Sequence, residues 1–102
     1  MKYVVTWTYR LNGSAAENDE TLRRGLAAFS KWSQPESTTY HQFVGRLDGG
    51  GFAVVETDNP ADLVETTGQF ATILDYQIYP VVDIAQAGQA LQRGVEFRDA
   101  VG

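Results

Sequence analysis

The chain has 102 residues, which is enough for one domain with a single hydrophobic core and too short for two. Its formal net charge of -5 argues against a nucleic-acid partner, because affinity for a phosphate backbone depends on clustered Lys and Arg. The absence of cysteine excludes disulfides, thiolate nucleophiles and Cys-based metal sites. No apolar run approaches the roughly 20 residues that cross a bilayer, so we expect a cytoplasmic domain without membrane contact.

The first expected element is a β-strand over residues 2–10, where side chains alternate and many are β-branched or aromatic. One face of this strand carries Tyr3, Val5, Trp7 and Tyr9. A helix should follow, capped by Ser14 or Asn18 and ending near residues 32–33, because Pro35 forbids its continuation. The apolar residues at helical spacing are Leu22, Leu26 and Phe29.

Two more strands are expected over residues 38–47 and 51–57, joined as a β-hairpin by Asp48-Gly49-Gly50. With the turn centred there, Phe43 lies opposite Glu56, although a slip of one residue would exchange the faces of one strand. One face of the hairpin then carries His41, Phe43, Leu47, Phe52, Val54 and Glu56, and the other carries Gln42, Val44, Arg46, Ala53, Val55 and Thr57.

The last part of the chain predicts a short helix, a fourth strand and a terminal helix. Asp58 or Asn59 can cap the short helix. The strand is expected over residues 74–79, stopped by Pro80, which cannot donate to a sheet ladder. The terminal helix, over about residues 83–98, needs a surface to lie on because its apolar residues keep helical spacing. Those residues are Ile84, Ala87, Leu91 and Val95.

The order β-α-β-β-α-β plus a terminal helix predicts a ferredoxin-like α+β fold, with an antiparallel sheet and two helices on one face. The opposite face of the sheet is not polar, and no helix is left to cover it. Small monomers rarely leave that much apolar surface in water. We therefore expect a homodimer in which two sheets face each other, with the terminal helix reaching across or covering an edge.

Four segments of the chain resemble a small bacterial family of uncharacterised domains. They are Met1 to Trp7, His41-Gln42-Phe43, Gly51 to Pro60 and Pro80 to Ile84. That family is similar to the dimeric α/β-barrel superfamily, which includes cofactor-independent antibiotic-biosynthesis monooxygenases, haem-degrading enzymes and muconolactone isomerase-like proteins. The resemblance implies a homodimer and a cavity between sheet and helices for a small, often aromatic, ligand. It carries over no catalytic residues.

His41 and Glu56 are the residues best suited to chemistry. His41 is the only histidine, and an imidazole can act as acid, base or metal ligand at physiological pH. Glu56 lies in an apolar strand, where burial would raise its pKa and suit it to general acid–base catalysis. The structural alternatives are an interface or backbone-bonded histidine, and a salt bridge from Glu56 to Lys2, Arg10 or Arg46. One histidine without a second ligand is a poor basis for a metal site, and no cofactor is expected.

Strand aromatics offer surfaces for a planar ligand, and we predict Trp7, Tyr9, Phe43 and Tyr76 as pocket residues, with core or interface packing as the alternative. The leading hypothesis is a small-molecule-binding dimer that could act as a cofactor-independent monooxygenase- or isomerase-like enzyme. Its substrate would be an aromatic or polyketide-like compound, and His41 and Glu56 would transfer protons. The sequence does not decide whether the domain is an enzyme. The rivals are a non-catalytic interaction or sensory module and a haem-binding protein that uses His41.

Overall fold

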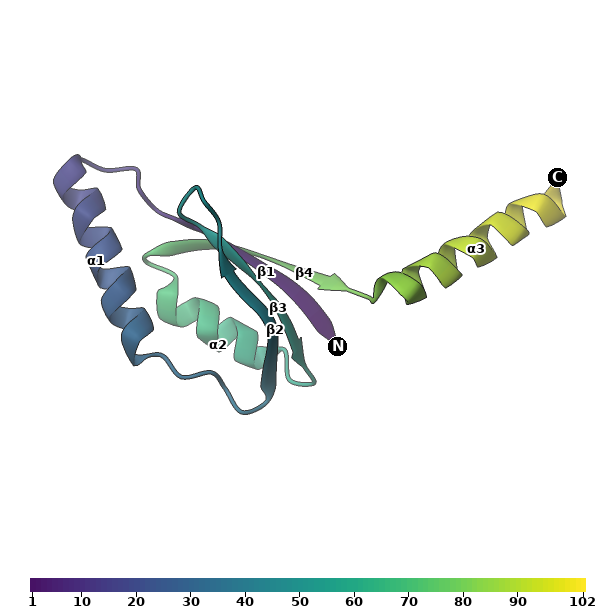
Figure 1. Ribbon diagram of the computed structural model, residues 1–102, viewed down its shortest axis with the longest axis horizontal. Helices are drawn as coiled ribbons and strands as arrows, with labels where there is room; N and C mark the ends of the chain where they lie inside the picture. Colours follow the sequence, from purple (N-terminus) through teal and green to yellow (C-terminus); the bar gives the residue numbers. More distant parts are fainter.

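The computed structural model describes residues 1–102 and contains one four-stranded sheet and three helices (Figure 1). The strands are β1 (Lys2–Tyr9), β2 (Thr38–Gly45), β3 (Gly51–Thr57) and β4 (Leu74–Val81). The helices are α1 (Ala15–Lys31), α2 (Ala61–Phe70) and α3 (Ile84–Val101). All neighbouring strands are antiparallel, in the order β2-β3-β1-β4. This arrangement confirms the predicted ferredoxin-like α+β fold with an extra C-terminal helix.

The hydrophobic core lies on one face of the sheet, under α1 and α2. One buried cluster joins the central strands β1 and β3 to α2, and consists of Val5, Ala53, Val55 and Leu63. A second cluster surrounds the start of β4 and consists of Phe70, Ile73 and Leu74. Both clusters use the alternating positions that face α1 and α2. The remaining helix, α3, extends away from the sheet (Figure 1), so the opposite face of the sheet has no helix over it. We call that surface the open face.

A capping box starts α1. The Ser14 hydroxyl accepts a hydrogen bond from the Glu17 N–H, while the Glu17 carboxylate accepts one from the Ser14 N–H. Of the two predicted caps, Ser14 is therefore the correct one, and Asn18 lies inside the first turn. At the start of α2 the prediction of Asp58 or Asn59 was wrong, because Pro60 occupies the N-cap and no side chain caps the helix.

The register of β2 on β3 differs from the prediction. Phe43 pairs with Ala53, and not with Glu56. The cause is the turn, because Gly45 pairs with Gly51 and residues 46–50 connect the two strands. A β-bulge at His41 then inserts one extra residue, so that Tyr40 and Phe43, three positions apart, both face the helices. The open face carries Lys2, Val4, Thr6 and Thr8 from β1, Thr39, His41, Gln42 and Val44 from β2, Phe52, Val54 and Glu56 from β3, and Asp75, Gln77, Tyr79 and Val81 from β4.

Four element boundaries also differ from the prediction. β1 ends at Tyr9 instead of residue 10. β2 ends at Gly45, so Leu47 lies in the turn and is fully exposed. β4 continues through Pro80 to Val81, because β4 is an edge strand and a proline can turn its missing N–H toward solvent there. The terminal helix ends at Val101 instead of about residue 98.

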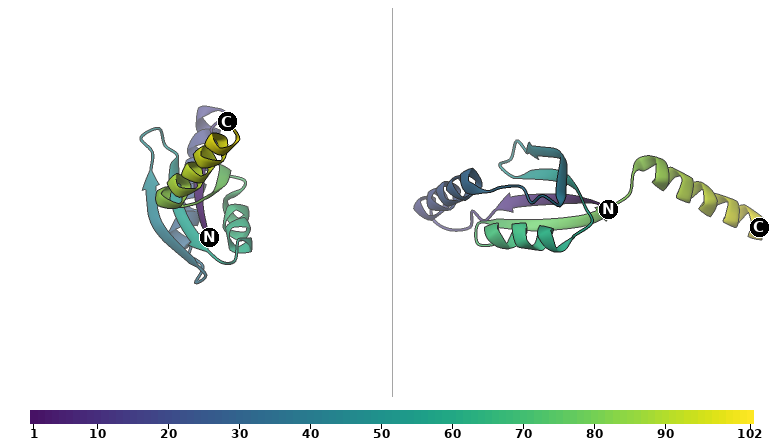
Figure 2. Two further views of the ribbon diagram at one scale, coloured as in Figure 1. Left: turned by 90° about the vertical axis from the view of Figure 1, so that its right-hand side faces the viewer. Right: turned by 90° about the horizontal axis from the view of Figure 1, so that it is seen from below.

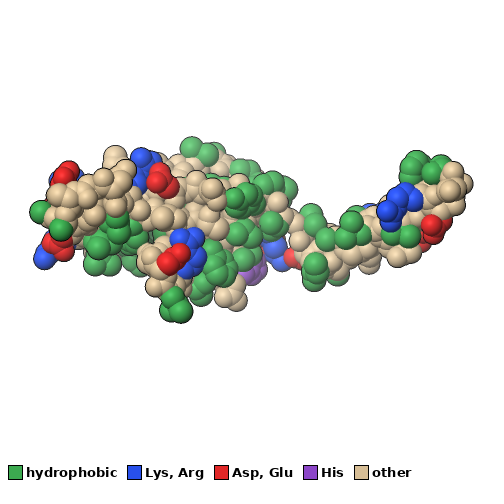
Figure 3. Space-filling model, turned by 90° about the horizontal axis from the view of Figure 1, so that it is seen from above, with side chains coloured by type: hydrophobic (Ala, Val, Ile, Leu, Met, Phe, Trp, Pro, Cys, Tyr) green, Lys and Arg blue, Asp and Glu red, His purple; other side chains and the backbone are tan.

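α3 extends away from the rest of the molecule in Figure 1 and in the right-hand view of Figure 2, which makes the longest dimension 62 Å against 31 Å for the next. None of its residues is buried, and apolar side chains are exposed along it (Figure 3). At its start, Lys2 Nζ donates a hydrogen bond of 2.7 Å to Asp83 Oδ1. The helix is thus tied to β1 at its base and uncovered over its length. None of the three helices has the length and apolarity needed to span a membrane.

Candidate functional site

A cavity of about 340 Å³ lies between the sheet and the helices α1 and α2. Its walls come from all four strands and both helices, and most of the side chains are apolar. Small-molecule sites in proteins commonly measure roughly 300–1,000 Å³, so this cavity falls at the lower end of that range. The four predicted pocket residues all line it: Trp7, Tyr9, Phe43 and Tyr76.

An aromatic cluster forms one wall of the cavity, with Phe43 at its centre. The Phe43 ring stacks on Tyr40, with ring centroids 5.1 Å apart. It meets Trp7, Phe29 and Trp32 edge to face, at 5.5, 5.7 and 5.8 Å. Offset stacking and edge-to-face contacts are the arrangements that aromatic rings prefer, so these rings hold one another in place. The wall presents rigid, flat apolar surfaces.

Hydrogen-bond donors interrupt this apolar lining. The Trp32 Nε1–H is buried and has no hydrogen-bond partner. Burial raises the pKa of Tyr40, and burial followed by the neighbouring phenols Tyr40 and Tyr9 raises that of Tyr76. Both phenols therefore keep their O–H as a donor at physiological pH. No carboxylate lines the cavity, and its one charged residue, Arg46, is held by Asp48 at 2.9 Å.

Two glycines allow the aromatic residues to approach the backbone. A Cβ on Gly51 would collide with the Trp7 indole and with the Val44 carbonyl oxygen, so only glycine lets that indole lie over β3. A Cβ on Gly25 would come within 2.9 Å of Tyr9 Cε1, which allows α1 to pack closely on β1. The shape of the cavity wall therefore depends on having glycine at positions 25 and 51 as well as on the aromatic rings.

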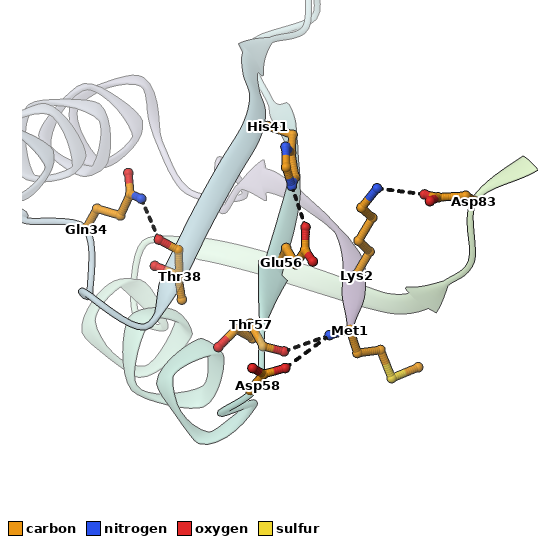
Figure 4. Close-up of polar contacts among 9 residues, drawn as sticks. All are labelled: Met1, Lys2, Gln34, Thr38, His41, Glu56, Thr57, Asp58 and Asp83. Atoms are coloured by element: carbon orange, nitrogen blue, oxygen red, sulfur yellow. Dashed lines mark hydrogen bonds and ion pairs between the residues drawn. The ribbon is translucent and has the colours of Figure 1, made fainter.

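His41 and Glu56 lie on the open face, with His41 Nε2 at 2.8 Å from Glu56 Oε1 (Figure 4). Both side chains are partly exposed, at 42% and 48%. The hydrogen bond to His41 lowers the pKa of Glu56, with a smaller contribution from Lys2. The expectation of a raised pKa was therefore wrong, because this carboxylate is paired and solvated instead of buried. No group of three or more His, Asp or Glu side chains gathers around a common point.

A family model described as a domain of unknown function, DUF3303, matches residues 1–95. The chain belongs to the DUF3303 family. The match covers the whole sheet, α1, α2 and most of α3, so all the residues of the cavity fall within it. No curated protein matches the chain.

In this DUF3303 domain the six predicted site residues lie in two places. The four aromatic residues line the cavity, whereas His41 and Glu56 lie on the other side of the sheet. The bulge at His41 separates them, because it turns Phe43 to the helix side while His41 stays on the open face. A haem held in the cavity could not be ligated by His41 in this arrangement.

Sequence reasoning missed the part that the helices contribute to the DUF3303 cavity. Trp32 supplies the unpartnered donor, and Thr66 and Thr67 of α2 also line the cavity. Trp32 follows Phe29 by three residues and therefore continues the apolar stripe of α1, which is the signal that could have identified it. The two threonines carry no comparable signal, because isolated hydroxyl residues are common on exposed helix faces.

Proposed function

We propose that this domain binds a planar, largely apolar small molecule that carries an oxygen acceptor, in the cavity between the sheet and the helices α1 and α2. The observation that supports this most directly is Trp32, a buried indole N–H without a partner in an aromatic wall. A buried donor left unpaired costs about 1–3 kcal/mol. After a small rotation of the indole, a carbonyl or phenol oxygen on a ligand would satisfy it, while the ligand's rings pack on Phe43 and Trp7.

The charges around the cavity narrow the ligand class. Because no carboxylate lines the cavity, nothing there would neutralise a cationic ligand. The lining donors, Tyr40, Tyr76 and Trp32, favour ligands with several oxygens and no net positive charge. Aromatic ketones, phenols and polyketide-like compounds have this chemistry.

Proton-transfer catalysis is a second candidate function, which the short His41–Glu56 contact favours. A histidine oriented by a carboxylate is a common general base. Since the sheet separates this pair from the cavity, a monooxygenase- or isomerase-like reaction at His41 needs a substrate that reaches the open face. Binding in the cavity does not depend on it. Substitution His41→Ala should therefore leave cavity binding unchanged.

The two tryptophans of the chain, Trp7 and Trp32, both line the cavity and report directly on its occupancy. We would titrate the protein with 2-acetylnaphthalene and with 2-ethylnaphthalene, which have similar shapes and differ in one carbonyl oxygen. Saturable quenching of tryptophan fluorescence is expected for both, with roughly five- to tenfold tighter binding of the ketone, the size of one hydrogen bond. Absence of saturable quenching by either compound would contradict the proposal.

Matched substitutions locate the binding. Phe43→Ala should weaken binding about tenfold or more, since it removes the centre of the aromatic wall, whereas Phe52→Ala makes the same change on the open face and should not. Trp32→Phe keeps the ring position and should abolish the preference for the ketone. Equal effects of the Phe43 and Phe52 substitutions would place the bound compound elsewhere.

A further inference from the structure

α3 carries an apolar stripe, interrupted by Arg98, that nothing in its own chain covers. On a helix of 3.6 residues per turn, its larger apolar residues and two of its four alanines fall within less than half of the circumference. They are Ile84, Ala87, Ala90, Leu91, Val95, Phe97 and Val101. Exposed fractions of 88% for Ile84, 72% for Leu91 and 71% for Val101 show that the stripe is solvated along its whole length. Helices in proteins owe most of their stability to packing of an apolar face, which α3 lacks, and Gly88 and Gly94 weaken this helix further.

The open face of the sheet is the matching uncovered surface. Val54, Val4 and Tyr79 lie side by side across β3, β1 and β4. Phe52 and Val44 form the apolar half of the next row, which Thr6 and Gln77 complete. Polar residues border this patch at both ends of the strands, with Glu56 and Lys2 at one end and Asp75 and Thr8 at the other. An apolar centre with a polar rim is the composition of a protein–protein interface.

The dimensions of the two surfaces agree. α3 has 18 residues and is about 27 Å long at 1.5 Å per residue. β1 and β4 have eight residues each and are also about 27 Å long. A helix laid along these strands would therefore cover the open face from one end to the other.

Charge also favours the contact. Arg98 lies within the apolar stripe of α3 and forms no ion pair in its own chain. Glu56 and Asp75 place carboxylates at the two ends of the open face, where they are also paired with His41 and Arg10 of their own chain. α3 itself is balanced, with two basic and two acidic residues, whereas the rest of the chain carries the whole net charge of -5. When α3 packs on a second copy, it therefore brings no additional net negative charge to the acidic remainder of that copy.

The connection to β4 directs α3 away from its own sheet. Only Val82 and Asp83 separate the two elements, Asp83 has an extended backbone, and its carboxylate is held by Lys2 on β1. Folding back over its own open face would require the chain to reverse direction within these two residues and break that ion pair. A second copy needs no such reversal.

We propose that α3 is an exchanged element: its apolar stripe packs on the open face of a second copy of this chain, which returns the same contact. A two-fold axis then buries both uncovered surfaces of both chains at once, and closes the assembly at a homodimer. Lys2 and Asp83 orient the helix for the exchange. The ligand cavity faces the other side of the sheet, so the dimer and the proposed ligand binding are independent of each other.

Light scattering on the full chain, coupled to size-exclusion chromatography, tests the exchange. The chain should elute at twice its own mass, and Leu91→Glu should weaken the dimer at least tenfold. Gln89→Glu adds the same charge on the opposite side of α3 and should leave the dimer intact. A monomeric parent protein, or a Leu91→Glu variant that dimerises like the Gln89→Glu variant, would overturn the proposal.

Cross-linking distinguishes exchange from closure on the same chain, and the absence of native cysteine makes it simple. The double substitution Val4→Cys with Leu91→Cys, treated with a short bismaleimide, should give a covalent dimer. Mixed single variants should link to each other as well. A product of one chain with both thiols consumed would mean that α3 folds onto its own sheet, and this result or no cross-link at all would reject the exchange.

Discussion

His41 and Glu56 face each other across β2 and β3 at 2.8 Å, on the side of the sheet that the helices leave open. Their contact depends on a β-bulge, since His41 is the extra residue that the bulge inserts. Bulges are often found where a side chain is re-aimed for a function. The pair is therefore a feature to test in its own right, separately from the cavity.

The carboxylate of Glu56 should titrate below its usual pKa of 4.5, mainly because His41 is hydrogen-bonded to it. Since folding lowers this pKa, the pair stabilises the protein above pH 4.5, and this contribution is lost as the pH falls through the lower value in the folded state. Carboxyl-detected NMR should show the low midpoint, and His41→Ala should move it upward. Urea unfolding should show that Glu56→Gln destabilises at pH 6 and much less at pH 3.

The exposed residue Glu36, which has no ion pair in the structure, provides the control. Glu36→Gln should change stability little at either pH. If Glu56 titrates at or above 4.5 in the folded protein, the contact with His41 does not persist in solution.

Gly51→Ala should destabilise the domain by about 1–3 kcal/mol, because the added Cβ collides with the Trp7 indole and with backbone. The shift of Trp7 should also appear as a changed tryptophan emission spectrum. Gly68→Ala is the matched change on α2, where nothing lies within 4 Å, and should stabilise by about 0.4–1 kcal/mol. Equal and small effects of the two substitutions in urea unfolding would contradict the close approach at Gly51.

Ser14→Ala should lower the free energy of unfolding by about 1 kcal/mol, since it removes the hydroxyl that accepts a hydrogen bond from the Glu17 N–H at the start of α1. The hydrogen bond from the Ser14 backbone also lowers the pKa of Glu17, so NMR of that carboxyl provides a second observable. Ser30→Ala, inside the same helix, should change the free energy of unfolding by a few tenths of a kcal/mol at most. If Ser14→Ala and Ser30→Ala lowered the free energy of unfolding equally, the capping box would not form in solution.

Val55→Ala should destabilise by about 2 kcal/mol, because Val55 is completely buried between the sheet and α2 and its methyl groups leave a void. Val64→Ala removes the same atoms from a side chain that is 69% exposed and should have little effect. Thermal unfolding of the two variants would measure the difference. A similar loss at both positions would mean that α2 packs differently from the structure.

Local patterns in the sequence determined the elements and their order. The alternation of Tyr3, Val5, Trp7 and Tyr9 identified β1, whose Val5 side the structure turns toward the helices, and Pro35 ended α1 because a proline cannot continue a helix. Period-two and period-3.6 spacings depend only on neighbours along the chain, so one sequence was sufficient for the ferredoxin-like topology.

Only the tertiary structure decided which residues of β2 belong to the cavity. Alternation alone assigns Tyr40 and Phe43 to opposite faces, yet the bulge at His41 places both under the helices. The bulge disrupts the ladder locally, and it allows Phe43 to pack among Trp7, Phe29 and Trp32. Packing between distant segments therefore decides on which face of the sheet an aromatic residue lies after a bulge. The spacing of residues along the chain does not indicate this face.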